Sequence, residues 1–198
     1  MESQPVIHPV AAGFFEQDTL TLAQSLLGCL LVKKTEEGVA AGFIVETEAY
    51  MGATDRAAHS YRERRTKRTE IMYHSPGHVY TYKMHTHCLV NVVSGGEGIP
   101  HAILIRAVDP HIGIGLMYER RQVKMEKQLT SGPGKLTKAL GITMEDYGRV
   151  FYEPPLFIAE GYVPVSISNG PRIGIDHTGE ARQYPYRFWV TDNPFVSR

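Results

Sequence analysis

The sequence predicts a mixed α/β (α+β) fold, in which helices flank a curved, mainly antiparallel sheet. Short apolar runs of strand length recur along the chain between Gly, Pro and Asn residues, and they do not alternate regularly with helices as a parallel sheet requires. The 198 residues, 42% of them apolar, suffice for one buried core. The chain contains no repeat, low-complexity tract or linker, so we expect a single domain over residues 1–198.

Capping and turn residues set the predicted elements in chain order. The first helix covers 17–27, with Asp18 or Thr19 as its N-cap and Gly28 at its end, and the run CLLVKK at 29–34 predicts the first strand. The remaining strands are predicted at 39–50, 77–83, 88–93, 102–108, 156–159, 172–176 and 186–190. The remaining helices are predicted at 66–73, 113–126 and 134–140.

The most informative segment is 43–59, FIVETEAYMGATDRAAH, in which an apolar strand continues into two carboxylates. At the period of a strand, Glu46 and Glu48 share one face. A carboxylate close to Tyr50 and His59 suits a base held beside a planar ligand in a cleft. The alternative is an edge strand whose two glutamates are solvated while Tyr50 covers the core.

The chain has no net charge, with 21 basic and 21 acidic residues, but its basic residues are clustered. The first cluster, opposed only by Glu63, consists of Arg62, Arg64, Arg65, Lys67 and Arg68. Because the guanidinium fork matches phosphate oxygens, we expect this loop to contact phosphates. A second run, with which Glu119 and Glu126 alternate, is expected to be a solvated helix face. It consists of Arg120, Arg121, Lys124 and Lys127.

The N-terminus and the cysteines indicate the compartment. The first fifteen residues, MESQPVIHPVAAGFF, lack a basic flank and a long apolar stretch, so we expect neither a signal peptide nor a membrane span. Cys29 and Cys88 lie in apolar runs, where a free thiol behaves as a small hydrophobe, and two cysteines make a disulfide framework improbable. We therefore expect a soluble cytoplasmic protein.

Three motifs that suggest a cofactor fail on inspection. Gly113 and Gly115 lack the third glycine of a dinucleotide site, and Gly113 is expected to begin a helix instead. The run SGPGKL at 131–136 lacks the first glycine and the final Ser or Thr of a Walker sequence. The 84–88 run MHTHC has metal-ligating residue types, but no third ligand lies at a supporting spacing. We expect no metal and no cofactor.

Several sequence blocks together resemble the alkyladenine (3-methyladenine) DNA glycosylase family over residues 15–197. They are IVETEAYMG at 44–52 with AAHS at 57–60, PGHVYTY at 76–82, ILIRAVDP at 103–110, SGPGKLTKAL at 131–140 and RIGIDHTGE at 172–180, in the family's order. The resemblance implies that family's single mixed α/β domain around a curved antiparallel sheet. It also implies base-excision repair by a monofunctional N-glycosylase, which flips a damaged purine out of duplex DNA, hydrolyses its glycosidic bond and leaves an abasic site.

The resemblance assigns three catalytic positions. Glu48 matches the general base that activates water for attack on the anomeric carbon, where positive charge builds as the bond breaks. Arg106 matches the arginine that contacts the backbone of the flipped nucleotide and helps to place the water. Ile173 matches the residue whose main-chain carbonyl holds that water.

The resemblance also assigns the base pocket. Tyr50 and His59 match the residues that sandwich the extruded base, and Ala57 and His59 offer backbone groups to it. Tyr82 closes its edge, and Asn91 matches an asparagine that disfavours the exocyclic amine of guanine. Electron-rich rings favour an alkylated, cationic purine. The substrates implied are 3-methyladenine, 7-methylguanine, hypoxanthine and ethenoadenine.

The chain departs from the family at the side chain that fills the gap left by the flipped base, commonly a tyrosine. Between Tyr82 and Asn91 the sequence reads KMHTHCLV, which contains no tyrosine. Counting forward from Tyr82 assigns this wedge to His85, whereas counting back from Asn91 assigns it to Met84, and apolar wedges occur in DNA-bending proteins. The partner implied is double-stranded DNA containing a damaged purine, bound by a monomer, at the nucleoid if the source is bacterial.

Two other classes of function stay open on the sequence alone. A non-catalytic nucleic-acid binding module uses the same basic loop and aromatic residues, but it does not need Glu48 in a dry pocket. A hydrolase of free nucleosides keeps the carboxylate but gains nothing from the cations of residues 62–68.

Overall fold

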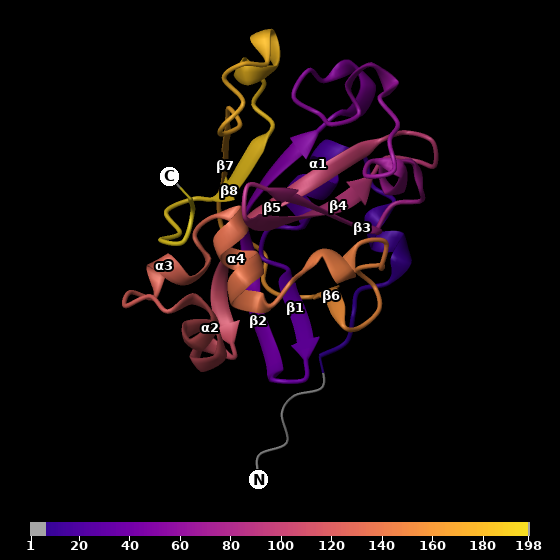
Figure 1. Ribbon diagram of the computed structural model, residues 1–198. Coiled ribbons are helices and arrows are strands. Elements are labelled where there is room, and N and C mark those ends of the chain that lie inside the picture. The colour runs from indigo at the N-terminus through magenta and orange to yellow at the C-terminus, as the bar shows by residue number, and fades with distance from the viewer. Residues whose placement is uncertain (1–6, 198) are drawn as a thin grey trace.

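A computed structural model describes residues 7–197, while residues 1–6 and 198 of the expected domain lie outside the described part. Its centre is a curved antiparallel sheet with the strand order β3-β4-β5-β2-β1-β6, to which β8 and then β7 are added along β2 (Figure 1). The strands are β1 (Leu30–Thr35), β2 (Gly38–Tyr50), β3 (Val79–Met84), β4 (His87–Ser94), β5 (His101–Ile112), β6 (Leu156–Ala159), β7 (Ile167–Gly170) and β8 (Arg187–Val190). The mixed α/β class predicted from the sequence is confirmed.

Within residues 7–197, four α-helices flank the sheet: α1 (Thr19–Ser25), α2 (Ile114–Arg121), α3 (Lys127–Thr130) and α4 (Pro133–Leu140). Asp18 caps α1 by accepting the Thr21 N–H at 3.1 Å, and Gly113 in the left-handed conformation begins α2, as predicted. Helix α1 packs on β2, and α4 packs on β4 and β5, so their apolar faces share one core with the sheet. No helix within residues 7–197 is long and apolar enough to cross a membrane.

Short 3₁₀ turns carry much of the remaining chain. They cover Ala12–Phe15, Gly52–Thr54, Tyr61–Glu63, Glu70–Tyr73, Met144–Asp146 and Gly179–Gln183. Those within 52–73 belong to the connection between β2 and β3, which carries the first basic cluster and lies beside the end of β2 (Figure 1). This connection forms one wall of the candidate site described below.

Strand β2 positions the two glutamates. Around residues 46–48 it pairs with β5 on one side and β8 on the other, and register shifts mark a bulge at Glu46. Glu46 and Glu48 both contact Arg106, so they share a face as predicted, and neither is exposed to solvent. The alternative of a solvated edge strand is therefore wrong.

Three element predictions are wrong because tertiary contacts or backbone geometry override the local pattern. Residues 172–176 form a turn and not a strand. The cause is that the Arg172 side chain and the Ile173 N–H bind carboxylates on other segments. Strand β7 lies earlier in the chain, at Ile167–Gly170. The predicted helix at 66–73 is a turn followed by one 3₁₀ turn. Helix α2 stops at Arg121 because Gln122 is left-handed, with φ of +52°.

The second basic run is only partly the solvated face that we expected. The Arg120 guanidinium donates to Glu37 at 2.6 and 3.0 Å and to the carbonyl of Ala139, and Arg121 donates to two carbonyls near the end of α3. These two arginines join segments of the protein. Lys124 and Lys127 are exposed.

Candidate active site

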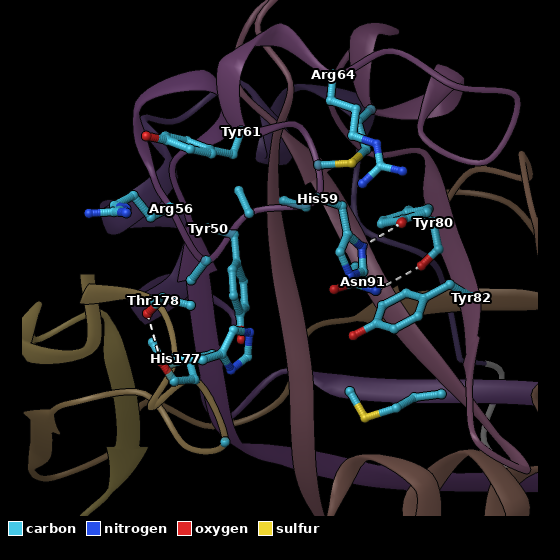
Figure 2. A pocket seen from close by; sticks show the side chains of 17 residues that line it. Tyr50, Arg56, His59, Tyr61, Arg64, Tyr80, Tyr82, Asn91, His177 and Thr178 are labelled. Carbon is cyan, nitrogen blue, oxygen red and sulfur yellow. Dashed lines mark hydrogen bonds between the residues drawn. The ribbon is translucent and has the colours of Figure 1, made fainter. Parts of the chain in front are cut away.

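A cavity of about 470 Å³ opens beside the end of β2. Tyr50 lies on one side of it, and His59, Tyr82 and Asn91 lie on the other (Figure 2). The β2–β3 connection, strands β3 and β4, and the 174–178 turn supply the lining. The remaining lining residues are Arg56, Ala57, Ala58, Tyr61, Arg64, Met72, Tyr80, Met84, Ala102, Gly174, Ile175, His177 and Thr178.

The wall opposite Tyr50 is built on His59. Its Nδ1 lies 2.8 Å from the hydroxyl oxygen of Tyr80, and its ring meets the ring of Tyr82 edge to face, with centroids 4.6 Å apart (Figure 2). Burial, together with the nearby charges of Arg68 and Arg64, lowers the pKa of His59 to about 4. His59 therefore presents an uncharged ring to the cavity at neutral pH.

The Tyr50 wall is connected to the buried carboxylate. The hydroxyl group of Tyr50 donates to Oε2 of Glu48 at 2.8 Å. Burial and the charge of Glu48 raise the pKa of Tyr50 well above its usual value, so the phenol stays protonated and remains a donor. Burial also raises the pKa of Tyr82 to about 12, so both rings are neutral.

Asn91 and Ala57 offer hydrogen-bonding groups in the wall of the cavity. The Asn91 amide nitrogen donates one of its two N–H groups to the main-chain carbonyl of Tyr80 at 3.0 Å, so its second N–H and its amide oxygen are available to a ligand. The N–H of Ala57 donates to Oδ1 of Asp55 at 3.0 Å, so the backbone group that Ala57 can offer is its carbonyl.

The three expected catalytic positions meet behind Tyr50. Oε1 of Glu48 accepts the main-chain N–H of Ile173 at 2.7 Å, and Oε2 accepts from Nη1 of Arg106 at 3.3 Å as well as from Tyr50. Glu48 and Arg106 do not line the cavity, and Glu48 has no exposed surface. The group of Ile173 that meets Glu48 is its N–H, whereas the resemblance pointed to its carbonyl.

Glu46 is the centre of a second buried network that the sequence did not indicate. Its Oε1 accepts from Arg106 at 3.1 Å, from Arg187 at 2.7 Å and from the Ser197 hydroxyl at 2.9 Å, and its Oε2 accepts the Ser197 N–H at 2.7 Å. Arg106 therefore bridges both glutamates. No local spacing connects Arg187 or Ser197 to Glu46, since they lie 141 and 151 residues away.

A further ion pair near the site, between Arg172 and Asp55, was also missed. Arg172 begins the block RIGIDHTGE, and Asp55 lies between the blocks IVETEAYMG and AAHS, so both residues lie in segments that the sequence singled out. Nothing in the spacing, however, pairs residues that are 117 positions apart.

The first basic cluster is only partly directed to the cavity. Arg64 lines it, whereas Arg65 forms a bidentate pair with Glu70 at 2.6 and 2.8 Å and stacks on Tyr73. The guanidinium carbon of Arg68 lies 6.0 Å from the ring centroid of Tyr82, beside the cavity. Arg64 is thus the one member of the cluster that lines the cavity, and of the other four Arg62 lies over the Tyr61 ring.

The two wedge candidates occupy different positions. Met84 is the last residue of β3, is 48% exposed, and lines the cavity on the strand face that also carries Tyr80 and Tyr82. His85 lies in the two-residue turn between β3 and β4, with φ of +53°, and is not a lining residue. The side chain directed to the cavity is therefore Met84.

Within residues 7–197 no three His, Cys, Asp or Glu side chains are grouped so that they could hold a metal ion. Cys29 and Cys88 are free thiols, as expected, and burial raises the pKa of each to about 11. Neither cysteine lines the cavity. The charged or imidazole side chains that line the cavity are Arg56, His59, Arg64 and His177, while Glu48 lies behind Tyr50.

Comparisons with known proteins show the family of this chain. The model of the methylpurine-DNA glycosylase family matches residues 13–194. A relative from Bacillus licheniformis is 63% identical over 194 residues, covering 98% of this chain and 99% of its own, and one from Bacillus subtilis is 63% identical over 191 residues, covering 96% and 97%. A relative from Listeria monocytogenes is 47% identical over 190 residues, covering 95% and 92%. All three are provisionally named 3-methyladenine DNA glycosylase.

Proposed function

Because this chain belongs to the methylpurine-DNA glycosylase family and is a DNA glycosylase, we propose that it excises alkylated or deaminated purines from duplex DNA. The proposed substrates are 3-methyladenine, 7-methylguanine, hypoxanthine and ethenoadenine. The observation that carries the proposal is the hydrogen bond between the buried carboxylate of Glu48 and Tyr50, an aromatic residue that lines the cavity. At about 470 Å³ the cavity falls in the range of small-molecule sites, about 300–1,000 Å³.

In the proposed reaction Glu48 is the general base. Cleavage of the N-glycosidic bond builds positive charge on the sugar, which a nearby carboxylate stabilises while it takes a proton from the attacking water. Oε1 has one hydrogen-bond partner among residues 7–197, the Ile173 N–H, so a lone pair remains for that proton. Arg106 holds the other side of the carboxylate and stays fixed by Glu46.

The extruded base is proposed to stack between Tyr50 and His59, with its edge towards Tyr82. Both rings are neutral and line the cavity, which suits stacking on a purine. Asn91 is proposed to disfavour the exocyclic amine of guanine, since its side chain lines the cavity and is held in place by its hydrogen bond to the Tyr80 carbonyl.

We assign the wedge to Met84 and not to His85. The side chain of Met84 is exposed beside the cavity, at the end of the strand that carries Tyr82, so it can enter the stack where the purine leaves it. Phosphate contacts are proposed for Arg62, Arg64, Lys67 and Arg68, with Arg65 weakened in this role by its pair with Glu70.

A duplex carrying one hypoxanthine or ethenoadenine, followed by hot alkali, tests the proposed function. Strand cleavage at the lesion is the expected result. Lesion binding without cleavage would favour a binding module, and release of base from free nucleosides alone would favour a nucleoside hydrolase.

We further propose a monofunctional reaction, so borohydride is expected to trap no protein–DNA adduct. The enzyme is proposed to act as a monomer, one domain over residues 1–198, in the cytoplasm and at the bacterial nucleoid.

A further inference from the structure

Arg172 joins three segments around the cavity although it does not line it. Its side chain has no exposed surface. Nη2 donates to Oδ1 of Asp55 at 2.8 Å and to the carbonyl of Ala181 at 3.2 Å, while Nη1 donates to Oδ2 of Asp55 and, at 2.9 Å, to the carbonyl of Ala49. One guanidinium therefore fixes the end of β2, the 51–57 loop and the chain before β8.

The same guanidinium supports the wall of the cavity. Its central carbon lies 4.6 Å from the ring centroid of Tyr50 and 5.4 Å from that of Tyr186. Because Tyr50 lines the cavity and Arg172 does not, the cation contacts this ring from outside the cavity. The Tyr50 ring is thus held at two places, at its face by Arg172 and at its hydroxyl by Glu48.

Asp55 extends this support to the backbone of the cavity. Its Oδ2 accepts the N–H of Met51 and its Oδ1 accepts the N–H of Ala57, both at 3.0 Å, so the loop between them is fixed. The residue after Arg172 is Ile173, whose N–H donates to Glu48. The Arg172–Asp55 pair therefore sets the position of the stacking ring, the Ala57 backbone and the amide on the proposed base.

Stability alone does not explain this arrangement. A buried ion pair contributes little net stability compared with apolar side chains of similar volume, because both charges lose their hydration. Nε of Arg172 is also buried with no hydrogen-bond partner among residues 7–197. What the planar fork does supply is four directed hydrogen bonds and a flat face against Tyr50, which no lysine reproduces.

We propose that Arg172, through Asp55, is a positioning residue that holds Tyr50 in the orientation required to stack on the extruded purine. The inference rests on the proposed glycosylase function. A small displacement of a positioning group from the reactive geometry costs about 10²-fold in rate. Arg172 acts through Tyr50 and Asp55, so its loss is expected to affect the handling of the base more than the grip on DNA.

Arg172→Lys tests this, with Arg120→Lys as the matched control. Arg120 is also a largely buried arginine that binds a carboxylate with two nitrogens and a main-chain carbonyl, but its partners Glu37, Thr35 and Ala139 lie away from the cavity. Both variants are compared with wild type below their melting temperatures, by single-turnover excision of hypoxanthine. Binding is measured to two duplexes, one with hypoxanthine and one with a tetrahydrofuran abasic analogue.

Arg172→Lys is expected to slow excision about 10²-fold and to weaken binding of the hypoxanthine duplex more than binding of the abasic duplex, which has no base to stack. Arg120→Lys is expected to change neither the excision rate nor the binding of the hypoxanthine duplex relative to the abasic duplex. Equal weakening on both duplexes would show a merely structural role and overturn the inference. If wild type excises hypoxanthine and Arg172→Lys is unaffected, the inference fails while the proposed function stands, whereas inactive wild type means that the proposed function itself fails.

A double-mutant cycle isolates the connection to Tyr50. In a Tyr50→Ala background, Arg172→Lys should cost little further excision, because the ring that it holds is gone. Additive losses would contradict the inference. If Arg172→Lys does not fold, Asp55→Asn replaces it in both experiments, because this variant keeps Arg172 but removes the carboxylate charge that orients its guanidinium. Unequal weakening on the two duplexes and a small further loss in the Tyr50→Ala background would support the inference. Equal weakening or additive losses would overturn it.

Discussion

Glu46 and Glu48 lie two positions apart on β2, yet their surroundings give them different roles. Glu46 accepts four hydrogen bonds, two from arginines and two from Ser197. Glu48 accepts three, one of them from the wall of the cavity. Of the two, Glu48 is the one hydrogen-bonded to a residue that lines the cavity, while Glu46 holds Arg106 and the end of the described chain in place.

Glu46→Gln is expected to lower the free energy of unfolding by about 3–5 kcal/mol, because it takes a counter-charge from the buried Arg106 and from the partly buried Arg187. Urea unfolding measures the effect, and Glu145→Gln, at an exposed position, is the control with little expected change. An equally small effect at both positions would show that the Glu46 network contributes nothing to the fold.

The pKa of His59 predicts a pH dependence of stability. In the unfolded chain His59 takes up a proton near pH 6.5, whereas in the folded protein it stays neutral down to about pH 4. The free energy of unfolding therefore has its full value, as far as His59 is concerned, above pH 6.5, and it falls as the pH drops from 6.5 to about 4. His59→Asn should therefore lose less stability between pH 7 and 4.5 than wild type does. His101, whose pKa burial also lowers, is present in both proteins and cancels. Parallel losses in urea unfolding would place His59 in contact with solvent.

At the scale of elements, the β3–β4 hairpin and the β2–β3 connection bring most of the residues proposed to contact DNA to the cavity and its surroundings. The hairpin carries Tyr82, Met84 and Asn91 from both of its strands. The connection carries His59 and the first basic cluster, which 3₁₀ turns hold beside Tyr73 and Tyr82. The connection thus carries one proposed stacking residue together with the proposed phosphate contacts, and the hairpin carries the proposed wedge.

Met84→Ala should reduce the flipped fraction, because the methionine no longer offsets the unstacking of a few kcal/mol when the base leaves the helix. The readout is 2-aminopurine fluorescence beside the lesion. His85→Asn is the control, since asparagine tolerates the positive φ of that turn, and it should leave the signal unchanged. A drop only in His85→Asn would transfer the wedge to the turn.

Replacing Arg64 by alanine should flatten the slope of log K against log salt by about one unit, as expected for one lost phosphate contact. Arg65→Ala should change it less, because the pair with Glu70 already neutralises that cation. If Arg65 gives the larger change, DNA must break that pair on binding. An unchanged slope for both would place the loop away from the phosphates.

At the scale of the whole molecule, the sequence predicted the elements that depend on local pattern. The run FIVETEAY gave the long central strand, and Asp18 and Gly113 marked the starts of α1 and α2. It failed where distant partners decide the conformation. The turn at 172–176 resembles a strand locally, but Asp55 and Glu48, more than 110 positions away, hold it.

The candidate site shows the same division. The residues on contiguous blocks, such as Tyr50, His59 and Tyr82, were predicted and do gather around one cavity, although their roles remain proposals. The supports behind them could not be predicted, because no spacing rule pairs Glu46 with Ser197 or Asp55 with Arg172. The fold alone brings them together, through the placement of β8 and the preceding turn against β2.

Single-turnover excision by wild type and Glu48→Gln, on a duplex with one hypoxanthine or ethenoadenine and in excess EDTA, tests the central claim most directly. Glutamine keeps the volume and hydrogen bonding of Glu48 but cannot take the proton of water, so excision should fall about 10²–10⁴-fold while lesion binding survives. Wild type should remain active in EDTA, since the bond broken requires only water and a carboxylate. Near-normal excision by Glu48→Gln would contradict the account.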